Sequence, residues 1–170
     1  MTVIGTMKQE NGKGTVRMED VFDTDIDDLW SAITEPNRLA RWLAVVTGDP
    51  QGTMQVSFRS SWEGPMTVTH CEAPHRLVVS SGEGDDITET EAVLTAEGDR
   101  TRLVIEERGL PLEDVSMHGA GWQVHVEDLE ALIEGREIEE WRPRWHELAP
   151  VYQAKPVAAA PKKPRFMLLW

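Results

Sequence analysis

Hydrophobic and polar residues alternate near the beginning of the chain, and further along they recur every three or four residues. Val16, Met18 and Phe22 alternate with charged or polar neighbours over about eight residues. Since successive side chains of a strand point to opposite faces, this segment is predicted to be a strand with one buried face.

Two short helices are expected after this strand. Thr24 or Asp25 suits the N-cap of the first, and Asp27 and Asp28 lie in its first turn, where the helix dipole favours acids. Its apolar stripe consists of Ile26, Leu29, Trp30 and Ile33. Pro36 ends this helix and begins another, whose apolar residues are Leu39, Trp42 and Leu43.

From residue 44 to residue 110 the period returns to two. Turn signals rich in glycine, proline and aspartate divide this region into short segments. The predicted strands are 44–47, 53–62, 65–71, 76–81, 87–95 and 101–108. Because short turns join consecutive strands, we expect an antiparallel meander.

After Pro111 the apolar residues again follow helical spacing, through Glu134, and Gly135 is suited to end that helix. The stripe of this long helix consists of Val115, Trp122, Val126, Leu129 and Ile133, with His118, His125 and Leu132 beside it. Trp141, Trp145 and Leu148 follow at helical spacing and predict a short helix packed on the body. The pattern predicts an α+β fold in which a curved antiparallel sheet wraps around a long C-terminal helix.

A length of 170 residues indicates one domain with short extensions. We assign residues 13–150 to the domain, residues 1–12 to a leader and residues 151–170 to a tail. The polar, glycine-containing leader is either a loose segment or a weak first strand.

The charge of the chain restricts its partners. Thirty acids against seventeen bases give a net charge of −13, which repels nucleic acid and anionic membranes. No apolar run approaches the length of a membrane span, and the first residues lack the order of a secretory signal. We therefore expect a cytoplasmic protein without nucleic acid or membrane as partner. The single cysteine, Cys71, excludes an internal disulfide framework and a multi-cysteine zinc site.

The tail differs from the body in composition. Residues 155–170 hold four bases and no acid, whereas residues 1–154 carry a net charge of −17. Its proline-rich part favours an extended spacer, and its last five residues are apolar. We expect the spacer to lie along the acidic body and the apolar end to dock in a groove, in cis or in trans. A homodimer, a tail-mediated contact and a disordered end all remain open at this stage.

Several short motifs follow one another over residues 14–150. They are FDTDIDDLWSAITEP at 22–36, LARWL at 39–43, EAPHRL at 72–77, GDRTRL at 98–103 and GW at 121–122. In this order they resemble the SRPBCC (START-like) superfamily, and within it the bacterial relatives of the C-terminal domain of the heat-shock protein 90 ATPase activator.

The resemblance implies a helix-grip fold with a cavity between the sheet and the long helix. Relatives use this cavity to hold lipids, polyketides or other apolar small molecules, some relatives cyclise polyketides, and the eukaryotic activator binds a chaperone. The chain departs from the family at Glu106-Glu107-Arg108-Gly109, where relatives often have a Thr-His-Ser-Gly-like sequence, and its tail lies outside the family pattern.

Five histidines raise the question of a metal site. His118 and His125 are seven residues apart, about 10.5 Å along a helix, which is too far for both to bind one ion. Neither Cys71 nor any serine lies in a recognisable nucleophile motif. We expect no metal and no cofactor, and the sequence does not identify catalytic residues.

The residues expected to bind a ligand lie on the two walls of the cavity. On strand 87–95 the small side chains of Thr90 and Ala92 face inward and leave room. Trp122 heads the helix face that closes the cavity, with His118 beside it, and Trp62 is expected at the mouth.

Glu107 shares the inward face of its strand with Leu103 and Ile105. It is either a polar anchor inside the cavity or a solvated strand end. Arg59 or His70, on strands of the same sheet, could pair with it.

The leading functional hypothesis is non-enzymatic binding of an apolar small molecule, because the sequence shows no convergent set of acid, base and nucleophile. The first alternative is a polyketide cyclase or aromatase, in which a carboxylate or histidine of the pocket would move protons. The second is an interaction protein that resembles the chaperone activator. Fold alone does not choose among these three.

Overall fold

The computed structural model describes residues 2–49 and 52–159. Its strands are β1 (Gly5–Glu10), β2 (Lys13–Phe22), β3 (Ala44–Gly48), β4 (Thr53–Phe58), β5 (Glu63–Glu72), β6 (Arg76–Ser81), β7 (Thr88–Glu97), β8 (Arg100–Pro111) and β9 (Ala158–Ala159). Its helices are α1 (Ile26–Thr34), α2 (Pro36–Trp42), α3 (Val115–Glu134) and α4 (Trp141–Gln153), with short 3-10 helices η1 (Gly84–Asp86) and η2 (Leu112–Asp114).

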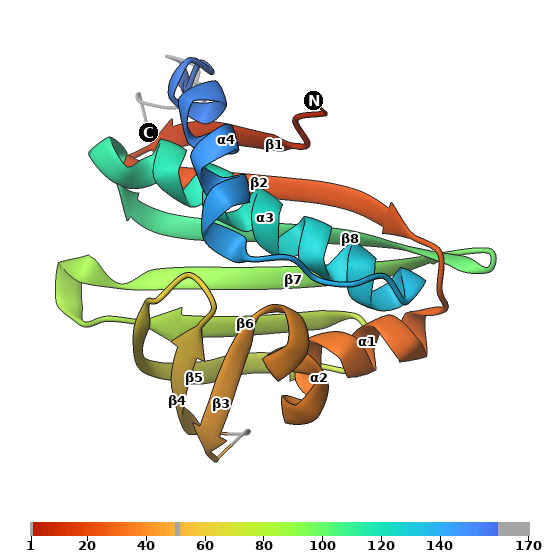
Figure 1. Cartoon of the computed structure of the whole chain (residues 1–170). Coiled ribbons are helices and arrows are strands. Elements are labelled where there is room, and N and C mark those ends of the chain that lie inside the picture. The colour runs from red at the N-terminus through yellow and green to blue at the C-terminus, as the bar shows by residue number, and fades with distance from the viewer. Residues whose placement is uncertain (1, 50–51, 160–170) are drawn as a thin grey trace, which may run out of the picture.

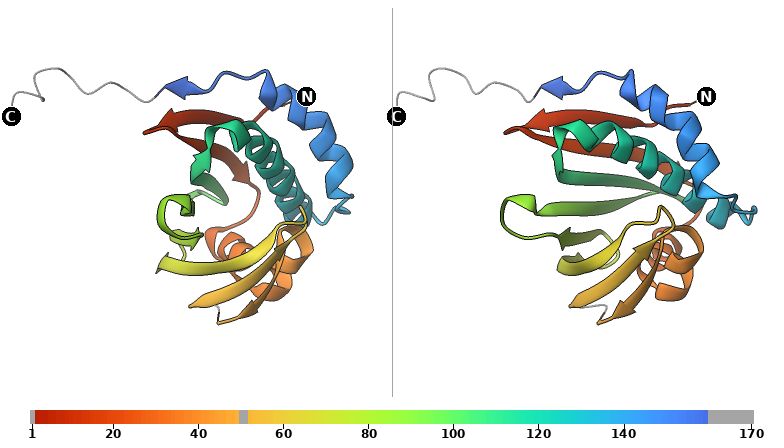
Figure 2. Two further views of the ribbon diagram at one scale, coloured as in Figure 1. Left: turned by 90° about the vertical axis from the view of Figure 1, so that its left-hand side faces the viewer. Right: turned by 60° about the vertical axis from the view of Figure 1, so that its left-hand side comes forward.

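All strands of the described residues belong to one sheet, in the order β3-β4-β5-β6-β7-β8-β2-β1-β9. Neighbouring strands are antiparallel except β1 and β9, which pair in parallel with Lys8 opposite Ala158. The sheet curves around α3, and α4 lies on the side of α3 that faces away from the sheet (Figures 1 and 2). The predicted α+β helix-grip fold is confirmed.

The two short helices begin and end where local chemistry predicts. The side chain of Asp25 caps α1 by accepting a hydrogen bond from the backbone N–H of Asp28 at 2.9 Å. Pro36 is the first residue of α2, a position at which its missing N–H costs nothing. Trp42, at the end of α2, is buried and donates a hydrogen bond to the carbonyl of Ala32 at 2.9 Å. The α1–α2 pair is thereby fixed against one end of the sheet.

Helix α3 is buried around much of its circumference because the sheet covers one side and α4 covers another. It ends at Gly135, whose φ of 72° is the left-handed conformation that glycine adopts most readily. Helix α4 approaches α3 closely at Gly119, where a Cβ atom would lie 2.7 Å from the ring of Tyr152. A glycine at this position therefore allows the two helices to pack together.

The hydroxyl of Tyr152 connects three elements of the fold. It accepts a hydrogen bond from the backbone N–H of Gly5 at 3.0 Å and donates one to Oε1 of Gln123 at 2.6 Å. Tyr152 is fully buried, as is Gln123 beside it. The end of α4 is thus fixed to β1 and α3 through buried polar groups.

The domain limits at residues 13 and 150 stay a prediction, and the structure places a strand before the first limit and a helix across the second. Of the two alternatives for residues 1–12, the strand is observed, because Gly5–Glu10 pairs with β2 along its whole length. A boundary at residue 150 would divide α4 and exclude Tyr152 from the core. The apolar end of the tail, whose docking was predicted, lies outside the described residues.

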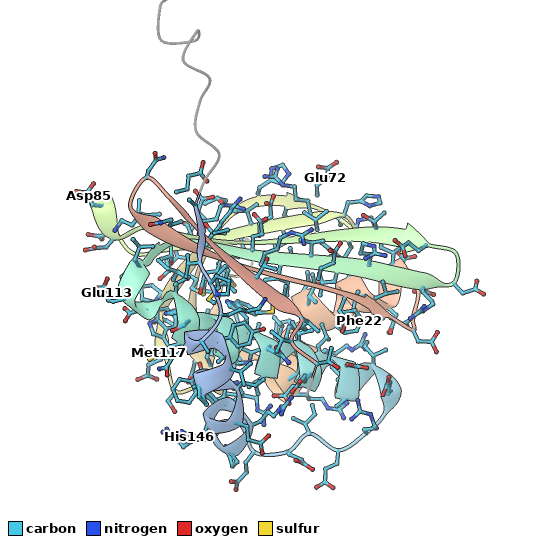
Figure 3. All side chains as sticks on the ribbon, turned by 90° about the horizontal axis from the view of Figure 1, so that it is seen from above. Phe22, Glu72, Asp85, Glu113, Met117 and His146 are labelled. Carbon is cyan, nitrogen blue, oxygen red and sulfur yellow. The ribbon has the colours of Figure 1, made fainter. Side chains whose placement is uncertain are left out.

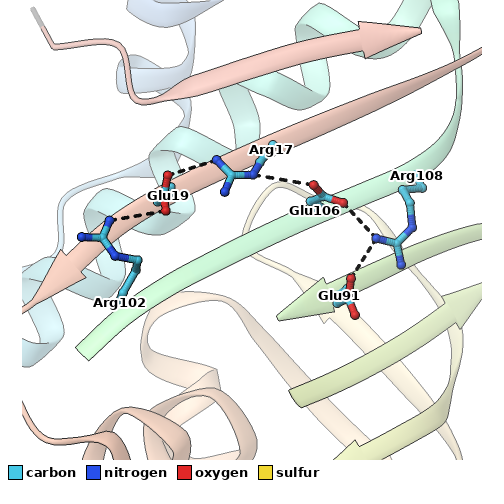
Figure 4. A network of polar contacts seen from close by, with 6 residues as sticks. All are labelled: Arg17, Glu19, Glu91, Arg102, Glu106 and Arg108. Atoms are coloured by element: carbon cyan, nitrogen blue, oxygen red, sulfur yellow. Dashed lines mark hydrogen bonds and ion pairs between the residues drawn. The ribbon is translucent and has the colours of Figure 1, made fainter. Parts of the chain in front are cut away.

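Charged residues of alternating sign form a network on the outer face of β2, β7 and β8 (Figure 4). Glu106 lies between Arg17 and Arg108, at 3.7 and 3.0 Å, and Glu19 lies between Arg17 and Arg102, at 3.1 and 3.3 Å. These pairs are partly exposed, so solvent screens them and they contribute little to stability. On its concave side the sheet presents apolar residues to α3.

Candidate functional site

A pocket of about 620 Å³ lies between the concave face of the sheet, the first half of α3 and the beginning of α4. The segments η1 and η2 flank it, at the end of the molecule where Asp85, Glu113 and Met117 are labelled in Figure 3. Its volume falls within the range of about 300–1,000 Å³ that small-molecule sites occupy. A ligand of several rings would fit in it.

Aromatic side chains form most of the apolar wall of this pocket. They are Phe58, Trp62, Trp122, His125, Trp141 and Trp145. The ring centroids of neighbouring members lie close together, with Phe58–Trp62 at 5.6 Å, Trp122–His125 at 5.5 Å and Trp141–Trp145 at 6.0 Å. The wall combines the β4–β5 turn, one face of α3 and the first turn of α4, which are far apart in the sequence.

The sheet supplies the opposite wall through the inward faces of β7 and β8. Thr88 lines the pocket, and Leu94, at the other end of the same inward face, is buried in the core. On β8, Leu103 and Ile105 are buried and Glu107 reaches the pocket. The alternation of side chains in the sequence therefore predicted the inward faces of both strands correctly.

Glu107 has a basic partner that the sequence analysis did not assign to it. Its Oε1 lies 2.7 Å from Nδ1 of His118 on α3, and Thr90 Oγ1 lies 3.5 Å from its other oxygen. Burial lowers the pKa of His118, but the hydrogen bond and charge of Glu107, with the charge of Asp114, outweigh burial and raise it. The pocket thus contains a carboxylate and an imidazole within proton-transfer distance.

Neither Arg59 nor His70, the two partners considered possible for Glu107, pairs with it. Arg59 extends from the end of β4 to α3, where it pairs with Asp128, and it donates a second hydrogen bond to the carbonyl of Glu139 at 2.9 Å. His70 lies near Glu72 on an exposed part of β5. The sequence does not show in which direction a long side chain points, so the pairing of Arg59 with Asp128 on α3 could not be foreseen.

The Arg59–Asp128 pair fixes the β4–β5 turn to α3 and to the segment that leads into α4. Burial raises the pKa of Asp128 to about 6, although the charge and hydrogen bond of Arg59 lower it. The guanidinium of Arg59 also lies near His125, which belongs to α3 as Asp128 does. This ion pair therefore supports the pocket from outside its lining.

His125 is buried at the centre of the aromatic wall. Burial and, to a lesser extent, the positive charge of Arg59 lower its pKa to about 3, so the imidazole is neutral at physiological pH. The backbone of Trp42 acts in the opposite direction and raises this pKa. Nδ1 of His125 has no hydrogen-bond partner among the described residues. Nε1 of Trp141 is likewise buried without a partner there.

The structure brings together some of the residues predicted to bind a ligand and separates others. Trp122, Glu107, His118 and Trp62 line the pocket. Thr90 and Ala92 lie on the predicted face of β7 but outside the lining, and Arg59 is also outside it. That the lining residues bind a ligand stays a prediction.

Trp122 is less accessible than expected. It is 8% exposed and belongs to the hydrophobic core, so its truncation would remove packing as well as pocket wall. A Trp122→Ala substitution would therefore change the stability of the fold together with any ligand binding.

Sequence reasoning missed four aromatic contributors to the pocket, one of which is Phe58, assigned only to a predicted strand. His125 was considered only as a metal ligand, and Trp141 and Trp145 were assigned to packing alone. Their helical spacing was visible in the sequence, but which side of α3 the helix α4 would cover depends on the close approach at Gly119.

Within residues 2–49 and 52–159, no three histidine, cysteine, aspartate or glutamate side chains gather as a metal ion would require. In the same ranges no helix has the length and apolarity needed to cross a membrane.

Comparison with known proteins gives a family and a set of similar structures. The family model described as activator of Hsp90 ATPase homolog 1-like protein matches residues 23–134. A search of curated proteins finds no match.

The solved structures that match cover most of the chain. CalU16 from Micromonospora echinospora is 25% identical with a TM-score of 0.70, and the alignment covers 88% of this chain and 94% of that one. DynU16, described as a putative protein in the dynemicin biosynthetic locus, is 26% identical with a TM-score of 0.64, over 72% of this chain and 48% of that one. A conserved protein of unknown function from Enterococcus faecalis, at 17% identity and a TM-score of 0.71 over 88% of each chain, shares the fold.

Proposed function

The chain belongs to the family of activator of Hsp90 ATPase homolog 1-like proteins, and from this premise we propose that it binds an apolar small molecule in the pocket between the sheet and α3. The observation that carries the proposal is the pocket itself, about 620 Å³ in volume and walled by six aromatic side chains. Burial of apolar ligand surface against such a wall is favourable by about 25 cal/mol per Å². The description of DynU16 as a protein of a biosynthetic locus favours a ligand of biosynthetic origin.

A neutral fluorescent probe, N-phenyl-1-naphthylamine, tests this proposal. We expect the probe to bind and its emission to rise. Thr88→Trp, which fills the pocket from β7, should weaken binding roughly tenfold, a change of about 1.4 kcal/mol. Isothermal titration calorimetry gives the affinities without interference from the added indole.

The matched control is Glu89→Trp. Glu89 is the next residue of β7 and pairs on the opposite face with Arg108, so the same side chain is added outside the pocket. An equal loss of affinity in both variants would contradict the assignment of the site, and the absence of any probe binding would contradict the proposed function.

A second candidate function is a cyclase-like enzyme, which one observation favours. Glu107 and His118 lie 2.7 Å apart at the pocket, and together they could accept a proton from a substrate and return it. The partly exposed imidazole of His118 would exchange the proton with solvent, while the carboxylate of Glu107 holds the imidazole ring in place.

Glu107→Gln should lower the pKa of His118, because the charge and hydrogen bond of the carboxylate are two of the causes that raise it. NMR titration of the imidazole measures this change. The control is Glu106→Gln, since Glu106 is the neighbouring residue on the outer face and pairs with arginines. An unchanged titration of His118 in Glu107→Gln would show that the pair does not form in solution and would remove this candidate.

A further inference from the structure

The rim of the pocket carries apolar side chains that solvent reaches. Among the described residues five large apolar side chains are exposed, and two of them, Trp62 and Met117, line the pocket. Two more adjoin lining residues in the chain, Ile87 directly after η1 and Leu112 at the start of η2. Single exposed apolar residues are ordinary, but a group of them beside one pocket is typical of a surface that binds a partner.

The same rim is acidic. Three carboxylates belong to the lining, those of Asp86, Glu107 and Asp114. Among the lining residues Arg142 alone has a permanent positive charge. Asp85 on η1 and Glu113 on η2 are exposed at the same end of the molecule (Figure 3). An occupant with basic groups is therefore favoured, because opposite charges attract.

The chain itself contains a segment that is both basic and apolar. Lys162, Lys163 and Arg165 precede the sequence FMLLW at residues 166–170, and no acid occurs after residue 154. This segment lies outside the described residues. Its bases complement the carboxylates of the rim, and its five apolar side chains complement the aromatic wall.

The described chain ends close enough to the pocket for this segment to reach it. Strand β9 runs parallel to β1, toward the end of the sheet where β8 leads into η2 (Figure 2). Ala159 pairs with Gln9, and Gln9 pairs with Gly14. Gly14 pairs in turn with Leu110, which lines the pocket. Three strand spacings, about 15 Å, therefore separate Ala159 from the pocket lining.

The length of the remaining chain exceeds this separation. Eleven residues follow Ala159. In an extended, proline-rich conformation of about 3.1 Å per residue they span about 34 Å, and the seven residues up to residue 166 span about 22 Å. Residues 166–170 can therefore reach the rim of the pocket in their own chain.

We propose that residues 166–170 dock on the rim of the pocket of the same chain and compete there with the ligand. The bases that precede them lie beside the carboxylates of the rim. This inference rests on the proposed binding function and adds a regulation of the same site. The ligand binds when the segment leaves, so its apparent affinity is lowered by the fraction of molecules in which the rim is covered.

Methionine methyl groups report on the docking in the whole chain. Met117 lines the pocket at the rim, whereas Met18 is fully buried in the core. The test variant combines Leu168→Ser, Leu169→Ser and Trp170→Ser. It should shift the ¹³C-methyl NMR resonance of Met117 and leave that of Met18 in place. In isothermal titration calorimetry it should bind N-phenyl-1-naphthylamine roughly fivefold more tightly than the wild type, because the competitor is lost.

Two further variants separate the charge of the segment from its apolar character. Lys162→Glu combined with Lys163→Glu should shift the Met117 resonance in the same direction, because the acidic rim repels the added carboxylates. The matched control is Val45→Ser. Val45 is 55% exposed on β3 and does not line the pocket, so its loss removes an exposed apolar side chain elsewhere and should change neither measurement.

The outcomes distinguish this inference from the proposed function. A Met117 resonance that stays in place in the serine variant would overturn the docking and leave the binding function, measured by the probe on the wild type, intact. A difference between the two proteins that disappears on roughly tenfold dilution would place the segment of a second copy on the rim and overturn docking within one chain. Absence of probe binding in both proteins would contradict the binding function and with it the competition.

Discussion

Replacing Tyr152 by alanine should lower the free energy of unfolding by about 3–5 kcal/mol, which is a large part of the stability of an ordinary domain. The ring is fully buried against Gly119 of α3, and its loss leaves a cavity between α3 and α4. The hydroxyl also satisfies the backbone N–H of Gly5, which would lose its partner. Urea unfolding followed by circular dichroism measures the change.

Tyr152→Phe separates the two contributions. It keeps the ring and removes only the hydroxyl, so we expect a loss of about 1–3 kcal/mol, because the backbone N–H of Gly5 loses its partner and Oε1 of Gln123 keeps only the longer hydrogen bond from Ile4 N–H, at 3.4 Å. His146→Ala on the same helix is the control. His146 is exposed on α4 (Figure 3), and its loss should change the free energy of unfolding by no more than about 0.5 kcal/mol. A Tyr152→Ala protein as stable as His146→Ala would mean that α4 does not belong to the cooperative core.

Arg59→Met should destabilise the protein by about 3 kcal/mol at pH 8 and by much less at pH 5. The substitution leaves Asp128 on α3 without its cation, and an unpaired carboxylate in a nearly buried position is costly. Unfolding in urea at the two pH values gives both numbers.

The pH dependence follows from the raised pKa of Asp128, about 6 in the folded protein against an ordinary value of 3.8. The folded state therefore holds this proton more tightly than the unfolded state, and its contribution to stability, about 3 kcal/mol, is lost as the pH rises from about 4 to 6. Without Arg59, which lowers this pKa, the loss extends to higher pH, so the variant and the wild type diverge above pH 6.

A second substitution provides the control for the charge itself. In the Arg59→Met background, Asp128→Asn removes the unpaired carboxylate and should recover much of the stability at pH 8. An Arg59→Met protein whose loss is the same at pH 5 and pH 8 would rule out the unpaired charge as the cause.

The elements of the fold were predictable because their signals are local. The cap at Asp25, the proline at residue 36 and the left-handed glycine at residue 135 each define a helix end in the sequence and in the structure. Strand β6 has the predicted limits, whereas the strand predicted at 53–62 ends at Phe58 because the chain turns there and enters β5 at Glu63. Alternation of side chains also gave the inward faces of β7 and β8 correctly.

The site was less predictable because its residues meet through tertiary contacts. Alternation identified Glu107 as inward, but its partner His118 belongs to a different element. Arg59 has a long side chain whose direction no periodicity determines, and it turns to Asp128. The unpartnered atoms of His125 and Trp141 are a property of the packed pocket and have no signal in the sequence.

The pairing of β1 with β9, and of Gly5 with Tyr152, has a consequence for synthesis on the ribosome. Residues 5 and 152 are separated by 147 positions, so the contact between them forms only when nearly all of the described chain has emerged. Domains in which early and late segments meet pay the entropy of closing a long loop and fold slowly. The contact of β1 with α4 must therefore wait for the last helix, and a ribosome that pauses before residue 152 holds a nascent chain whose core is still incomplete.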